Sequence, residues 1–65
     1  MSVETLSNVY DALDDEPRTP NEIATRLGRD QKTVQGALLE LVATKSDVKW
    51  KKIGRLRVFW KARKK

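Results

Sequence analysis

The sequence predicts a small α+β fold in which a three-helix bundle precedes a two-stranded antiparallel β-hairpin. Up to about residue 44, apolar residues recur every three or four positions, as on one face of a helix. Beyond that point they alternate with charged residues, which is typical of strands. The 65 residues suffice for one domain, which buries about 60% of the surface that its unfolded chain exposes. We expect this domain to span residues 1–61 and a basic tail to follow over residues 62–65.

The first helix is predicted over residues 2–14, with Ser2 as its N-cap. Its apolar stripe comprises Val3, Leu6, Val9, Tyr10 and Leu13. The helix ends at the acidic segment 14–17, where carboxylates oppose the helix dipole. We expect these acids either to pair with a base such as Arg18 or to keep phosphate away from this corner. A solvated acidic turn is favoured there over a Mg²⁺ site.

Two further helices are predicted on either side of a short turn. The first begins at Thr19-Pro20-Asn21-Glu22, which suits a capping box with proline at the first helical position, and ends at Gly28. The second begins after Asp30 as N-cap and runs from Gln31 to about Thr44. Their apolar positions are Ile23, Ala24 and Leu27 in the first, and Val34, Ala37, Leu38, Leu41 and Val42 in the second. The turn between them is typical of a DNA-binding helix-turn-helix, although other helical hairpins share it.

The hairpin is predicted over residues 48–52 and 56–61, in one of two registers. A two-residue loop at Gly54-Arg55 pairs Ile53 with Leu56, whereas a three-residue loop pairs Lys52 with Leu56. The three-residue loop gathers the apolar residues Val48, Trp50, Leu56, Val58 and Trp60 on one face, which we expect to pack on Val34, Leu38 and Leu41. It therefore predicts that both tryptophans belong to the core and that Phe59 points outward.

The formal net charge is +5, and its distribution is strongly uneven. Residues 1–28 carry two basic and six acidic side chains, and residues 29–65 carry twelve basic and three acidic ones, so the halves have charges of −4 and +9. A molecule polarised in this way should approach a polyanion with one preferred face. We expect the tail, together with Lys61, to add non-specific affinity.

Several classes of protein are disfavoured by what the sequence lacks. There is no cysteine or histidine, which disfavours disulfides, metal sites and haem, so we expect no cofactor. No nucleophile with a general base can be named either, so we do not expect an enzyme. Without a signal peptide or an apolar run that could span a membrane, a cytoplasmic protein at the nucleoid is expected.

The segment TPNEIATRLGRDQKTVQGALLELV followed by VKWKKIGRLRVFWK resembles the winged helix-turn-helix domains of bacterial and archaeal transcription regulators, and the resemblance covers residues 2–61. It implies that the third helix enters the major groove of duplex DNA and that the hairpin, or wing, touches the neighbouring backbone or minor groove. The implied DNA-binding residues are Arg29, Gln31, Lys32, Thr33, Gln35 and Gly36 around the third helix, and Lys51, Lys52, Arg55 and Arg57 in the wing. Gln31 and Gln35 can pair with adenine, and Lys32 can reach guanine or phosphate.

Leu39 departs from this family pattern, because relatives usually carry a polar residue there. It either extends the core or contacts a second protein. The expected function is therefore a sequence-preferring duplex DNA-binding protein, with a role in transcription regulation. A winged-helix interaction module remains an alternative, with a protein partner or a second copy bound through Leu39 or the first helix. Binding of duplex RNA is a third, since basic charge alone does not separate the two nucleic acids. The Pro-Pro element of the branch that binds Z-form DNA is absent.

Overall fold

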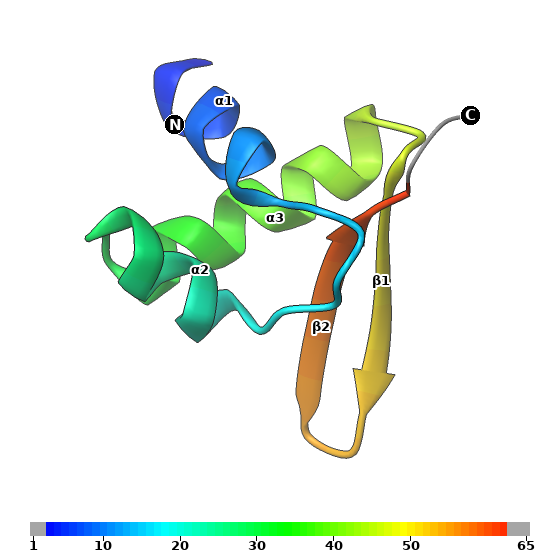
Figure 1. The fold of residues 1–65 in the computed structure, drawn as a ribbon. Helices are drawn as coiled ribbons and strands as arrows, with labels where there is room; N and C mark the ends of the chain where they lie inside the picture. Colours follow the sequence, from blue (N-terminus) through cyan, green and yellow to red (C-terminus); the bar gives the residue numbers. More distant parts are fainter. Residues whose placement is uncertain (1–2, 63–65) are drawn as a thin grey trace.

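The computed structural model describes residues 3–62, which form three helices followed by a two-stranded antiparallel hairpin (Figure 1). The elements are α1 (Val3–Ala12), α2 (Pro20–Leu27), α3 (Gln31–Thr44), β1 (Val48–Ile53) and β2 (Leu56–Lys61). The predicted α+β class and the order of its elements are confirmed. Ser2 as N-cap and the last three residues of the predicted tail lie outside the described residues. Ala62, which the prediction assigned to the tail, donates its backbone N–H to the carbonyl oxygen of Asp47 at 2.7 Å.

The helix ends are fixed by local hydrogen bonds that the sequence predicts. The Thr19 hydroxyl accepts from the Glu22 amide and the Glu22 carboxylate accepts from the Thr19 amide, both at 3.3 Å, which completes the capping box. Gly28 has a φ of 66° and closes α2 in the left-handed conformation. The Asp30 carboxylate caps α3 by accepting from the Thr33 amide at 3.3 Å. These caps set the short turn between α2 and α3.

The core surrounds α3, which packs against both other helices and the hairpin. Its buried residues are Val9, Leu13, Ile23, Ala24, Val34, Ala37, Leu38, Leu41, Val48 and Phe59. The buried stripe of α3 is as predicted, apart from Val42, which is only half-buried. In α1 the prediction is wrong at its first position, because Val3 is exposed and Thr5 is buried in its place.

The predicted three-residue loop of the hairpin is wrong, because the turn has two residues, Gly54 and Arg55. Ile53 pairs with Leu56 and Trp50 with Phe59, so β2 is turned over relative to the prediction. Phe59 is 1% exposed in the core, whereas Trp50 is 46% exposed. Trp60 and Val58 pair with Lys49 and Lys51, so they lie on the face opposite Phe59. Both are half-buried there.

Only the end of the hairpin nearest the helices is buried. The register that gathers the most apolar residues along a whole face was therefore the wrong choice. Val48 and Phe59 lie at that end, and the turn lies well away from the helices (Figure 1). A dry site there suits phenylalanine better than tryptophan, whose indole N–H needs a hydrogen-bond partner. Two backbone hydrogen bonds also hold Phe59, because its N–H donates to the Arg18 carbonyl at 2.8 Å and its carbonyl accepts from the Arg18 amide at 3.0 Å. The segment before α2 therefore covers the second edge of β2.

The acidic segment after α1 uses one carboxylate to hold Arg18, as one of the two sequence-based alternatives predicted. Asp14 accepts from the Arg18 guanidinium at 3.1 Å and from the Glu16 amide at 2.9 Å. These hydrogen bonds, that of Arg18 foremost, lower the pKa of the Asp14 carboxyl. The ionised form of Asp14 therefore stabilises the fold.

The pH dependence of unfolding tests this pairing. Because the pKa of Asp14 is lower in the folded state, its stabilising effect is complete above the unfolded-state value of about 3.9 and is lost as the pH falls through the folded-state value. We expect Asp14→Asn to be less stable than the parent at pH 7 and to lose less further stability below about pH 4. Melting temperatures measured between pH 2 and 7 give this comparison, with Asp11→Asn as a control on the exposed face of α1. Parallel curves for the parent and Asp14→Asn would contradict the assigned role.

Candidate nucleic-acid interface

A groove of about 690 Å³ separates the exposed side of α3 from the turn end of the hairpin. We call it the α3–hairpin groove. Gln31 and Gln35 line one wall, Lys52, Arg55 and Arg57 line the other with Gly54 and Leu56, and Thr19, Pro20 and Asn21 close one end. Among the described residues that line it, three are basic and none is acidic. The groove thus combines a positive wall with a helix that presents two exposed amides.

Helical periodicity explains why Gln31 and Gln35 share the groove while their neighbours do not. Residues four apart lie on the same side of a helix, and both side chains are exposed. Thr33, halfway between them, points to another side of α3 and is half-buried. Lys32, Gly36 and Arg29 also lie outside the groove lining, and Lys32 and Arg29 are exposed beside it.

The register of the hairpin divides its basic residues between two faces. Lys52 and Arg57 pair directly and share the face of Val48 and Phe59, which turns toward the helices. Lys51 pairs with Val58 on the opposite face and does not line the groove. The structure therefore brings together five of the ten sequence-predicted site residues: Gln31, Gln35, Lys52, Arg55 and Arg57.

Trp50 orients one of these basic groups. The guanidinium of Arg57 lies 5.6 Å from the centroid of the Trp50 ring, close enough for a cation–π interaction. This contact explains how a half-exposed tryptophan serves the hairpin without belonging to the core. It also limits the directions in which Arg57 can extend into the groove.

Sequence reasoning missed the groove residues contributed by α2 and the turn. Asn21 lies in the first turn of α2 and its exposed amide faces the groove end. Its polar side chain beside the capping box, at the start of the helix before the turn, was the available signal. Leu56 gave no such signal, because the predicted register placed its side chain on the face that packs on the core.

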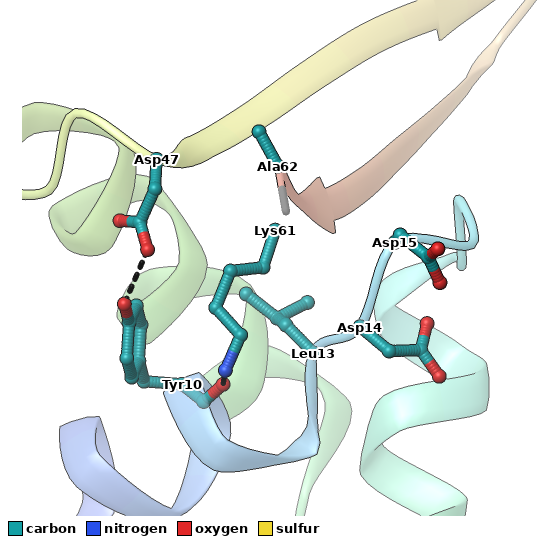
Figure 2. A pocket seen from close by; sticks show the side chains of 7 residues that line it. All are labelled: Tyr10, Leu13, Asp14, Asp15, Asp47, Lys61 and Ala62. Carbon is teal, nitrogen blue, oxygen red and sulfur yellow. Dashed lines mark hydrogen bonds between the residues drawn. The ribbon is translucent and has the colours of Figure 1, made fainter. Parts of the chain in front are cut away.

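A second hollow, of about 370 Å³, has the opposite character (Figure 2). Asp14, Asp15 and Asp47 line it with Tyr10, Leu13, Lys61 and Ala62. The Tyr10 hydroxyl donates to the Asp47 carboxylate, and this hydrogen bond is the main reason why the pKa of Tyr10 is raised. Three carboxylates disfavour a polyanion here, so this hollow is not part of the candidate interface.

Lys61 belongs to this second hollow rather than to a tail that binds nucleic acid. Its ammonium donates to the carbonyl oxygen of Tyr10 at 3.4 Å and lies 4.3 Å from the centroid of the Tyr10 ring. Its backbone N–H donates to the Asp14 carbonyl at 2.7 Å. Lys61 thus ties β2 to α1, and the expectation that it acts with the tail has no support in this arrangement.

Comparison of the chain with protein-family models, curated proteins and solved structures gave no match. Within residues 3–62, no helix has the length and apolarity needed to cross a membrane.

Proposed function

We propose that this protein binds duplex DNA as a winged helix and acts in transcription regulation. The observation that carries the proposal is the α3–hairpin groove, in which Gln31 and Gln35 face Lys52, Arg55 and Arg57. An α-helix fits the major groove of B-DNA, where glutamine can pair with adenine through two hydrogen bonds. Basic side chains opposite such a helix can meet phosphates and fix its position on the duplex.

Charge separation supports one orientation of the complex. The groove has a basic wall, and the hollow lined by Asp14, Asp15 and Asp47 lies outside it. A duplex that approaches the groove meets attraction, whereas the acidic hollow repels it. Phosphate contacts release counterions, so affinity should fall steeply as salt rises.

Titration of labelled duplex DNA, duplex RNA and single-stranded DNA at two salt concentrations tests the proposal. We expect the tightest binding for duplex DNA and a strong loss of affinity at the higher salt concentration. Tighter binding of duplex RNA would favour the RNA alternative. Affinity for duplex DNA that barely changes with salt would contradict docking through the basic wall.

Replacing Gln35 with alanine tests base reading separately from backbone binding. If Gln35 reads a base, the change should cost about 1–3 kcal/mol of binding free energy at the preferred site and little on random DNA. Selection of binding sites from random duplexes, followed by titration of the selected site, measures both. Thr33→Ala is the matched control, because Thr33 lies on the same turn of α3 but outside the groove.

An interaction module is the second candidate function, and the exposure of Leu39 favours it. Leu39 is 48% exposed on α3, which leaves a partner contact as the remaining sequence-based explanation. If Gln35→Ala binds its best site and random DNA as the parent does, Gln35 does not read bases and this candidate gains. A charge introduced as Leu39→Glu should then abolish association with the protein partner, since an interface does not tolerate a buried unpaired charge. Under the DNA-binding proposal, Leu39→Glu keeps its non-specific DNA binding.

A further inference from the structure

The turn of the hairpin carries two exposed aliphatic side chains. Ile53 and Leu56 pair directly across Gly54 and Arg55, so their side chains lie on one face of the hairpin. They are 57% and 60% exposed. Solvent-exposed strand positions usually carry polar residues, so this apolar pair at the strand ends needs an explanation.

Packing within the molecule does not provide one. The buried residues of the hairpin, Val48 and Phe59, lie at its other end and on its other face. The turn itself lies away from all three helices (Figure 1). Ile53 and Leu56 therefore form an apolar tip that the described fold leaves in water.

The surroundings of this tip indicate what would cover it. Lys51 and Lys52 precede Ile53, Arg55 occupies the turn, and Arg57 follows Leu56. None of the residues from 48 to 61 is acidic, so the charge complements a polyanion. Leu56 also lines the α3–hairpin groove at its turn end.

These features fit the minor groove of duplex DNA. That groove is too narrow for a helix, and proteins that enter it often insert apolar side chains between base pairs, which unstacks them and bends the duplex. Basic residues on both sides of the tip can meet the phosphates of the two strands. The direct pairing across a two-residue turn places both side chains next to each other on one face, which forms a compact apolar insert.

We propose that Ile53 and Leu56 act as an apolar wedge, which enters the minor groove and unstacks a base step beside the major groove that α3 occupies. This inference rests on the proposed DNA binding and adds a mode of action to it, namely bending of the duplex. The wedge is a contact of shape and apolar area, and it adds no phosphate contact.

The experiment compares the parent with the double variant Ile53→Thr, Leu56→Thr. Threonine keeps a high strand propensity while it removes most of the apolar surface. We expect the variant to bind duplex DNA roughly tenfold more weakly with an unchanged salt slope. Duplexes carrying 2-aminopurine at successive positions report unstacking as increased fluorescence, and end-labelled duplexes report bending by energy transfer. Both signals should be present with the parent and absent with the variant. Val3→Thr is the control, because it changes an exposed aliphatic residue on α1.

Each of the following outcomes would overturn the wedge. If the parent binds duplex DNA without unstacking or bending it, or if the variant binds equally well, Ile53 and Leu56 do not enter the groove, and the proposed function stands. If the parent does not bind duplex DNA at all, both proposals fail together. If the variant loses binding to vesicles of phosphatidylglycerol and phosphatidylcholine, or loses self-association in sedimentation velocity, and keeps its DNA affinity, the tip contacts lipid or a second copy instead.

Discussion

Replacement of Phe59 by alanine should unfold a large fraction of the molecules at room temperature. Phe59 is 1% exposed and is among the largest fully buried side chains of the described residues. Such a truncation costs about 3–5 kcal/mol, and a domain of this size has little more stability than that. Urea and thermal unfolding followed by circular dichroism measure the loss.

The two tryptophans provide matched controls for this substitution. Trp50 is 46% exposed, so alanine there removes less buried surface than at Phe59, and Trp60 is half-buried on the face opposite Phe59. Phe59→Leu keeps most of the apolar volume and should be less harmful than Phe59→Ala. If Phe59→Ala melts like the parent while Trp60→Ala unfolds, the register and the core described above are wrong.

The parts of the fold that the sequence predicts best are those that depend on local chemistry. Thr19, Glu22 and Asp30 cap their helices through groups no more than three residues away. Gly28 ends α2 because it adopts a positive φ without strain. The bounds of α3 follow from its cap and its apolar period, and its buried stripe follows with them.

The register of the hairpin was not predictable in the same way, because it depends on contacts distant in the sequence. The prediction that Val48 of β1 faces the core was right. In β2 the opposite face turns toward the core, so Phe59 is buried there and not the predicted Trp60. The backbone of Arg18 holds β2 in place through its pairing with Phe59, 41 positions along the chain. The pattern of residues 48–61 alone does not predict that contact.

The same register decides which part of the candidate site could be predicted. Gln31 and Gln35 follow from the helical period, which the sequence displays directly. In the hairpin, a shift of the pairing register by one residue moves every side chain of a strand to the other face. The sequence therefore predicts basic hairpin contacts, but it does not separate Lys52 from Lys51. That distinction required the pairing of Lys52 with Arg57 on the groove side.

Replacement of Lys52 and Arg57 together by alanine should weaken binding to every duplex sequence and flatten the dependence of affinity on salt by about two units. Both side chains line the α3–hairpin groove, so each is proposed to meet a phosphate and to release a counterion. Loss of phosphate contacts affects all sequences alike because phosphates carry no sequence information. Titration at several salt concentrations gives the slope of log affinity against log salt. Circular dichroism verifies that this variant and its control remain folded.

The matched control replaces Lys49 and Lys51 by alanine. This variant has the same net charge as Lys52→Ala, Arg57→Ala, so long-range attraction to the duplex falls by a similar amount. Lys49 and Lys51 pair with Trp60 and Val58 on the face opposite Lys52 and Arg57 and do not line the groove, so most of the salt slope should remain. If the two double variants lose affinity and slope equally, only net charge matters and the groove does not position the duplex. If the Lys49, Lys51 variant loses more, the outer face of the hairpin supplies the phosphate contacts and the α3–hairpin groove does not.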